Sequence, residues 1–270
     1  MRELALTDTH AHCLPGLDDG PTHMAATLAA LEMAAQAGVR RLVATPHWYP
    51  GLYKATTQEV QLAYEAVLEA LGDKPHPELI VAREYLLCDE LLELADKEPL
   101  ATIGAGYVLI ELGMRIPASL KTVVFGLRSR GYNLILAHPE RCPQLVEEDD
   151  DRNWLLAQGC LFQLTQPSLM GDFGREFGDA AARLLKLGAA HLLASDAHCQ
   201  LRGEWSLLTA RRYLADHWGE ELAFHLTEDW PQQLVEGKAL DTLALGEQVR
   251  SLTRSRRRNL FTRLFAGLWR

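Results

Sequence analysis

One segment of the chain reads Asn133-Leu134-Ile135-Leu136-Ala137-His138, an apolar run that stops at a histidine. Apolar runs elsewhere also lead into side chains that can bind metal, namely His47, Glu84 and Glu111. These runs alternate with segments of helical spacing, which is typical of parallel strands joined by helical crossovers. Because the carboxyl ends of the strands in an α/β barrel all face one rim, we expect these side chains to meet there.

The alternation predicts seven units of strand and helix. Strands are expected at 4–7, 39–44, 79–82, 107–110, 133–137, 160–164 and 191–194. Helices are expected at 22–36, 57–71, 88–95, 119–129, 151–158, 173–187 and 204–217, and the chain from there to about Val249 also has helical spacing. Thr22 is expected to cap the first helix at its N-terminus and Gly38 to stop it.

Seven such units favour one closed or nearly closed (β/α)7 barrel over a doubly wound open sheet, because only the barrel brings every strand end to one face. The 270 residues suit a single barrel, which often takes roughly 250 residues. We expect residues 1–250 to form the barrel domain and residues 251–270 to be a C-terminal extension. No second domain, internal repeat or low-complexity linker is evident.

The composition is that of a soluble globular protein, with 48% hydrophobic and 23% charged residues. The formal net charge of −9 argues against nucleic acid as a main partner. Five cysteines without paired spacing indicate reduced thiols in a cytoplasmic protein. The first residues are too polar for a signal peptide, and no apolar run approaches the roughly 20 residues that span a bilayer.

Two histidine pairs stand near the two ends of the expected barrel. His10 and His12 are two residues apart, so both point to the same side of an extended strand. Asp196 and His198 repeat this spacing after the seventh strand. With an acid from the loop Asp18-Asp19-Gly20-Pro21 and the strand ends above, the candidate metal ligands are His10, His12, Asp19, His47, Glu84, Glu111, His138, Asp196 and His198.

Each candidate ligand alone also fits a structural role, such as a core histidine or an aspartate in a turn. A carboxylate that ends a buried strand, however, costs free energy unless it is paired or coordinated. One zinc-like site takes about four ligands. Nine candidate ligands therefore predict two or three metal ions, with Glu84 as a candidate to bridge two of them. Nitrogen and oxygen ligands without thiolate suit manganese, iron or zinc. Such centres bind phosphate and activate water.

Two arginines are candidates to bind phosphate, because a guanidinium can grip two phosphate oxygens. Arg141 follows His138 by three residues, and Arg202 follows His198 by four. A surface salt bridge is the alternative role for both. No cysteine is followed six residues later by arginine, which excludes a Cys-x5-Arg phosphatase with a covalent phosphocysteine.

The loop after His47 is aromatic. Trp48, Tyr49 and Tyr53 either form a wall for an aromatic substrate ring or are ordinary loop residues that pack or face solvent.

These motifs together resemble the polymerase and histidinol phosphatase (PHP) superfamily. Within it, the Asp18-Asp19-Gly20-Pro21 element resembles the bacterial manganese-dependent protein-tyrosine phosphatases of capsule and exopolysaccharide biosynthesis. The likeness runs from about Ala5 to about Val235, with the motifs in the same order.

The resemblance implies a distorted (β/α)7 TIM-like barrel that holds three divalent metal ions. It implies three ligand sets: His10, His12, Glu84 and Asp196; then Glu84, Glu111 and His138; then Asp19, His47 and His198. It also implies that Arg141 binds the substrate phosphate. The substrate it implies is the phosphotyrosine tail of a bacterial tyrosine kinase that controls polysaccharide export.

Three other functions stay open from the residues. One is a small-molecule phosphatase of the same superfamily, acting on histidinol phosphate or a nucleotide. Another is a regulatory scaffold on a degenerate barrel, against which the apparently complete ligand set argues. The third is a metal-dependent amidohydrolase, which also begins with two histidines two residues apart, although Arg141 and the double acid favour phosphate.

The stretch from Arg254 to Arg270 is basic, with leucine and aromatic residues at helical spacing. It is expected either to pack on the barrel or on a neighbouring subunit of a homo-oligomer, or to lie on an anionic membrane. Binding to an anionic membrane would place a cytoplasmic protein at the inner face of that membrane.

Overall fold

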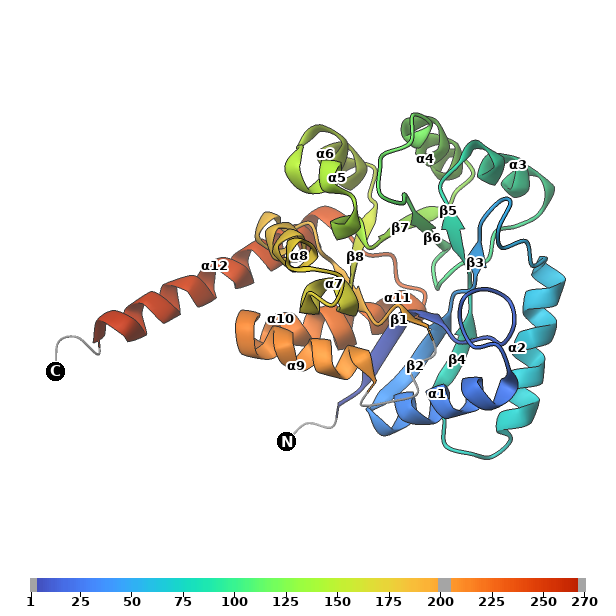
Figure 1. Ribbon diagram of the computed structural model, residues 1–270. Coiled ribbons are helices and arrows are strands. Elements are labelled where there is room, and N and C mark those ends of the chain that lie inside the picture. The colour runs from blue at the N-terminus through green and yellow to red at the C-terminus, as the bar shows by residue number, and fades with distance from the viewer. Residues whose placement is uncertain (1–3, 199–204, 267–270) are drawn as a thin grey trace.

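Two parallel sheets form the centre of this computed structural model, which describes residues 4–198 and 205–266, with residues 256–266 as helical backbone only. The strand order is β10–β1–β2–β4 in one sheet and β3–β5–β6–β7–β8–β9 in the other (Figure 1). The strands are β1 Leu6–His12, β2 Val39–Ala44, β3 His47–Trp48, β4 Glu78–Val81, β5 Glu84–Leu86, β6 Tyr107–Glu111, β7 Asn133–Ala137, β8 Leu161–Thr165, β9 Leu192–Ala194 and β10 Ala197–His198.

Helices surround these strands (Figure 1). They are α1 Met24–Gln36, α2 Thr57–Leu71, α3 Asp89–Lys97, α4 Leu120–Ser129, α5 Pro143–Glu147, α6 Asp150–Ala157, α7 Gln166–Met170, α8 Arg175–Leu187, α9 Ser206–Trp218, α10 Glu220–Phe224, α11 Trp230–Val235 and α12 Thr242–Ala266. A 3-10 turn spans Pro139–Arg141 and a π-helical turn spans His225–Asp229. The expected α/β class with parallel strands is confirmed.

Three short strands were not expected, and each follows a longer strand after a two-residue break. The breaks separate β2 from β3, β4 from β5 and β9 from β10. Each one carries the chain from one sheet into the other. Backbone hydrogen bonds continue within the breaks: the N–H groups of Thr45 and Ala82 donate to Ala11 and Ala44, both at 2.9 Å. His47 and Glu84 therefore begin short strands just beyond a break, at the carboxyl end of the strand before it.

Two boundary predictions at the start of the chain are wrong. The first strand runs from Leu6 to His12 rather than over 4–7, so both histidines belong to it. The first helix begins at Met24, and its N-cap is His23, not Thr22. His23 has an extended backbone, and its Nδ1 accepts a 3.2 Å hydrogen bond from the Ala26 N–H. Thr22 lies one residue outside this turn.

Other predictions hold. The boundaries of β2, β7 and α2 are as expected. Gly38 follows the end of α1 with φ of +86°, a left-handed conformation that costs glycine little, as expected for a helix stop.

The core lies between the strands and the helices around them. Leu109, Ile135 and Phe162, on β6, β7 and β8, are fully buried, as expected for parallel strands covered by helices. Val249 on α12 is also buried, and Arg250 donates to the Leu187 carbonyl at 3.1 Å. The first part of α12 is thus anchored to the body, while its last turns extend beyond it (Figure 1). None of the described helices is long and apolar enough to cross a membrane.

Candidate metal centre

All nine expected ligands lie within the described residues, and contacts of 3.0 to 3.8 Å between their side chains link them into one cluster. They come from β1, the loop after it, β3, β5, β6, the end of β7 and the turn between β9 and β10. The expectation that the strand ends converge therefore holds for each of them.

Glu84 lies at the centre of the cluster and is fully buried. Its Oε2 is 3.2 Å from His10 Nε2 and 3.4 Å from His12 Nε2. The same oxygen is 3.1 Å from His47 Nδ1, while Oε1 is 3.0 Å from His138 Nε2. Burial alone would raise the pKa of Glu84, but the surrounding histidines hold this pKa well below its usual range. Glu84 is therefore an ionised carboxylate facing four imidazoles.

Asp196, in the turn between β9 and β10, contacts the same two histidines. Its Oδ1 is 3.4 Å from His10 Nε2 and 3.6 Å from His12 Nε2, and these two nitrogens are 3.1 Å apart. Burial opposes ionisation of Asp196, but His10 and Arg141 lower its pKa. Asp196 and His138, with φ of 53° and 34°, are the non-glycine residues with positive φ in the described chain. Such backbone strain is commonly held at functional sites.

The open side of the cluster is formed by Asp19, His47 and His198. Asp19 Oδ1 is 3.6 Å from His47 Nε2 and 3.4 Å from His198 Nε2. The Asp19 side chain is 49% exposed and that of His198 is 32% exposed, whereas His10, His12 and Glu84 are inaccessible. A substrate can therefore approach the cluster from this side.

Three of the histidines use their other ring nitrogen to hydrogen-bond an oxygen that is not itself a candidate ligand atom. His12 Nδ1 lies 2.7 Å from Asp18 Oδ2, and His10 Nδ1 lies 2.9 Å from Gln163 Oε1. His198 Nδ1 lies 2.9 Å from the Asp196 carbonyl oxygen. Metal-binding histidines usually have such a partner, because it fixes the ring and leaves the remaining nitrogen as a ligand.

Two further residues that position the cluster were not predicted from the sequence. Gln163 lies within β8, where an amide in an otherwise apolar run was the signal available. Asp8 is buried in β1 and accepts hydrogen bonds from the Ser195 N–H at 3.0 Å and Trp205 Nε1 at 2.7 Å. Asp8 therefore fixes the turn that carries Asp196.

The donor atoms fit divalent metal ions. His47 Nδ1 and Glu84 Oε2 are buried, and neither has a hydrogen-bond partner, although they lie 3.1 Å apart. Two buried polar atoms without a partner are costly unless a ligand satisfies them. Ligand atoms within 4.8 Å of one another form three groups: His12, Asp19, His47 and His198; His10, His12 and Asp196; His47, Glu84 and Glu111. Nitrogen and oxygen donors of this kind suit manganese, iron or zinc.

Arg141 lies beside the cluster. Its Nη2 donates to Asp196 Oδ2 at 2.6 Å and to Thr165 Oγ1 at 3.1 Å, and its Nε donates to Ser168 Oγ at 3.4 Å. The other arginine predicted to bind phosphate, Arg202, lies outside the described residues.

The aromatic residues after His47 have different surroundings. Tyr53 stacks on His47, with ring centroids 5.3 Å apart and planes 8° apart. Trp48 instead contacts the buried Tyr85 at 5.9 Å between ring centroids. Tyr49 pairs with Tyr53 through the backbone. Of the three residues of the predicted aromatic wall, Tyr53 is the one whose ring contacts the cluster.

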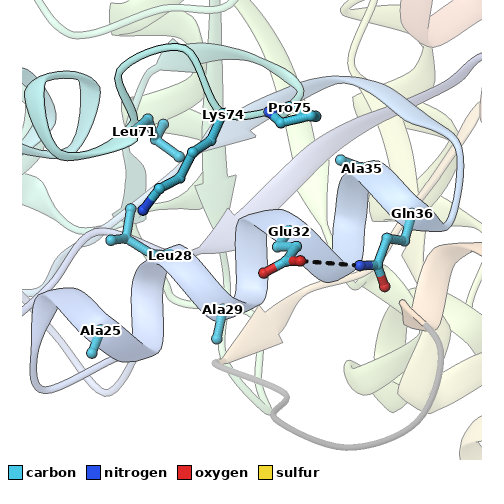
Figure 2. A pocket seen from close by; sticks show the side chains of 9 residues that line it. All are labelled: Ala25, Leu28, Ala29, Glu32, Ala35, Gln36, Leu71, Lys74 and Pro75. Atoms are coloured by element: carbon cyan, nitrogen blue, oxygen red, sulfur yellow. Dashed lines mark hydrogen bonds between the residues drawn. The ribbon is translucent and has the colours of Figure 1, made fainter.

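A separate cavity of about 730 Å³ lies between α1 and the loop that follows α2. Figure 2 shows its lining, with the Glu32–Gln36 hydrogen bond on α1 and Lys74 reaching toward Leu28. The lining is otherwise made of alanine, leucine and proline side chains and includes no histidine. The cavity is therefore distinct from the candidate metal centre and offers no comparable ligand set.

Comparison with known proteins identifies relatives of this chain. A family model for capsular polysaccharide synthesis, CpsB/CapC, matches residues 6–236. The tyrosine-protein phosphatase YwqE of Bacillus subtilis is 30% identical over 83% of this chain and 89% of its own length. The putative tyrosine-protein phosphatase CapC of Staphylococcus aureus is 32% identical over 72% of this chain and 77% of its own.

A solved structure from work on YwqE of Bacillus subtilis and CpsB of Streptococcus pneumoniae also matches this chain. That work describes the two proteins as unique metal-dependent tyrosine phosphatases. The TM-score is 0.77 at 28% identity, covering 87% of this chain and 96% of the matched chain.

Proposed function

The chain belongs to the CpsB/CapC family of capsular polysaccharide synthesis, as its motifs predict, and we propose that it hydrolyses phosphotyrosine in proteins in a metal-dependent reaction. The observation that carries this proposal is the convergence of the nine candidate nitrogen and oxygen ligands beside Arg141. The chain supplies a buried ligand cluster, an open side and an adjacent guanidinium, which are the parts that a metal-dependent phosphomonoesterase needs.

We propose that the cluster holds three divalent ions, manganese first, with iron or zinc as alternatives. His10, His12, Glu84 and Asp196 would hold one ion, and Glu84, Glu111 and His138 a second. Asp19, His47 and His198 would hold the third, on the open side. When bound, such ions polarise the phosphate and lower the pKa of a water molecule.

Arg141 is proposed to bind the phosphate of the substrate. Its guanidinium has five N–H donors, and the three hydrogen bonds to Asp196, Thr165 and Ser168 hold it in place. Donors that remain can bind oxygens of a phosphate at the cluster and stabilise the charge that develops on them. Arg202, four residues after His198, is proposed as a second phosphate ligand on the basis of the sequence.

The chemistry of the leaving group is consistent with this site. The phenol of tyrosine has an intrinsic pKa of about 10. As a leaving group, tyrosinate therefore needs less protonation than an alkoxide when the ester bond breaks. A site that is open on the side of Asp19 and His198 therefore suits an aryl phosphate carried on a flexible peptide.

We also propose that the two sheets form one distorted (β/α)7 barrel of the PHP type. The support lies in the two-residue breaks, since counting β2 with β3, β4 with β5 and β9 with β10 gives seven strands. Residues 1–250 would make up the phosphatase barrel and residues 251–270 the basic extension. Helix α12 runs through this boundary.

The proposed partner is the phosphotyrosine tail of a bacterial tyrosine kinase that controls capsule or exopolysaccharide synthesis. A cytoplasmic location at the inner membrane face would bring the enzyme close to such a kinase. The segment from Arg254 to Arg270 supports membrane contact, because it has six arginines and no acid in a chain of net charge −9. Contact with a neighbouring copy in a homo-oligomer is the alternative role of this segment.

The test is hydrolysis of a phosphotyrosine peptide by metal-reconstituted protein, with histidinol phosphate and nucleotides as competing substrates. We expect preference for the peptide, and loss of activity on chelation and in His138→Ala. The matched control is His217→Ala, because His217 is exposed on α9 and has no contact with the cluster. Full activity in the presence of chelator would contradict the proposal, and preference for histidinol phosphate would favour a small-molecule phosphatase.

A further inference from the structure

Phe173 is an exposed aromatic residue beside the candidate metal centre. It lies in the turn between α7 and α8, and 53% of its surface is accessible. The guanidinium carbon of Arg141 lies 4.7 Å from the centroid of its ring. The ring of Phe177 contacts it edge to face at 6.4 Å between centroids. Phe173 is therefore held from two sides while much of its ring stays accessible.

A short series of contacts joins this ring to the buried ligands. Arg141 contacts the ring of Phe173 and donates to Asp196 Oδ2 at 2.6 Å. Asp196 Oδ1 in turn lies 3.4 Å from His10 Nε2. A phosphate bound by Arg141 at the cluster would thus lie next to an accessible aromatic surface. In phosphotyrosine, the phenyl ring begins one ester oxygen away from phosphorus, so it would reach that surface.

The neighbouring loops at the same end of the strands also expose apolar side chains. Leu52 is 63% exposed and lies in the loop that follows β3, the short strand that begins at His47. Met114 is 60% exposed three residues after Glu111, which ends β6. Apolar side chains offer contact area to an aryl group and its flanking peptide, whereas a polyhydroxylated or charged small substrate needs hydrogen-bond donors and acceptors.

Tyr53 is less suited to receive the substrate ring. Its side chain is only partly exposed, less than that of Phe173, and one face of its ring stacks on His47 in nearly parallel planes. Phe173 is more exposed and contacts Arg141, the residue proposed to bind the phosphate, so it is the better placed of the two to distinguish aryl from alkyl esters.

We infer that Phe173 is a specificity-determining residue that contacts the phenyl ring of phosphotyrosine while Arg141 binds its phosphate. This inference rests on the proposed function. An aromatic pair favours offset or edge-to-face contact and adds to the burial of apolar area. Phe173 therefore lowers the free energy of the bound aryl ester, and it contributes nothing comparable to an alkyl ester such as phosphoserine.

The test compares Phe173→Ala and Phe173→Trp with the wild type, each loaded with Mn²⁺. The substrates are two peptides of the same sequence that carry phosphotyrosine or phosphoserine, and inorganic phosphate serves as a competitive inhibitor. For Phe173→Ala we expect kcat/KM for the phosphotyrosine peptide to fall about tenfold. The inhibition constant of phosphate and any turnover of the phosphoserine peptide should stay within about twofold. Phe173→Trp should retain the preference for phosphotyrosine.

The matched control is Phe125→Ala, because Phe125 is 67% exposed on the outer helix α4. We expect it to change none of these constants. Weaker phosphate inhibition in Phe173→Ala would mean that Phe173 acts by holding Arg141, and would overturn the inference. So would an unchanged kcat/KM for the phosphotyrosine peptide. A wild type that hydrolyses no phosphotyrosine peptide would instead overturn the proposed function itself.

Discussion

Asp18 and His12 are joined by a 2.7 Å hydrogen bond between the carboxylate Oδ2 and the imidazole Nδ1. The same oxygen accepts the backbone N–H of His47 at 3.0 Å, and Oδ1 accepts that of Gly20 at 3.0 Å. Burial would raise the pKa of Asp18, but the hydrogen bond and charge of His12 lower this pKa to about 2. One carboxylate thus orients two candidate ligands from different strands.

We expect Asp18→Asn to weaken metal binding about 10- to 100-fold, because the amide removes the charge that fixes the His12 ring and raises its basicity. The measurement is calorimetric titration of metal-free protein with Mn²⁺. Asp73→Asn is the control, since Asp73 is exposed in the turn after α2. Equal affinities for both variants would mean that Asp18 does not support the metal centre.

The nine candidate ligands were predictable because each carries a ligand group at a strand end or in a short motif. Asp8 and Gln163 were harder to assign, because they lie inside strands and act mainly through partners that are distant in sequence. Asp8 contacts Ser195 and Trp205, which the chain brings near it only when β9 and β10 lie beside β1.

The two-residue breaks could not be predicted, because the strands that follow them are too short to show a period. β3 and β10 have two residues each and β5 has three. Their positions depend on pairing between strands, such as His47 opposite Glu84, which is not encoded in local spacing. The phosphate-binding role of Arg202 stays a prediction.

Gly104 and Gly106 offer a paired test of the turn before β6. Both have positive φ, at +49° and +74°. A Cβ on Gly104 would lie 1.7 Å from the Leu234 carbonyl oxygen on α11, whereas a Cβ on Gly106 would meet nothing within 4 Å. We expect Gly106→Ala to lower the free energy of unfolding by about 1–2 kcal/mol through backbone strain alone.

Gly104→Ala should add a further ~1–3 kcal/mol, because backbone atoms must shift to admit the methyl group. Urea unfolding of the two variants in chelator measures the difference. Similar losses would show that α11 can move away from this turn without cost.

His191 provides a test of stability against pH. Burial lowers the pKa of this imidazole to about 3, and its Nδ1 accepts the Phe162 N–H at 2.9 Å. Between this pKa and the ordinary value of about 6.5, the unfolded chain binds a proton that the folded chain does not. The folded state therefore loses stability as pH falls below about 6.5, by up to ~1.4 kcal/mol per pH unit from this residue.

We expect His191→Gln to be less stable than the wild type at pH 7, because packing is lost, but less sensitive to acid. Urea unfolding in chelator at pH 7, 6 and 5 should show the difference between the two proteins shrinking as pH falls. His217→Gln, at an exposed position, should keep the slope of the wild type. A constant difference between His191→Gln and the wild type would show that His191 binds a proton equally well in the folded and unfolded states.

Deletion of residues from Arg254 onward tests the proposed membrane contact. Each basic residue near an anionic surface contributes roughly 1 kcal/mol, and the deletion removes six arginines. We expect the full chain to co-sediment with phosphatidylglycerol vesicles but not with phosphatidylcholine vesicles, and to be released by salt, which screens charge. The shortened chain should stay in the supernatant with both.

The shortened chain retains Val249 and Arg250, which anchor the first part of α12 to the body, so it should fold and keep its phosphatase activity. Activity against a soluble phosphotyrosine peptide is therefore the control for folding. Unchanged partition after the deletion would exclude membrane contact through this segment. If sedimentation equilibrium then showed a smaller assembly for the shortened chain, the basic helix would be assigned to a contact between subunits, because its apolar residues need a partner in either case.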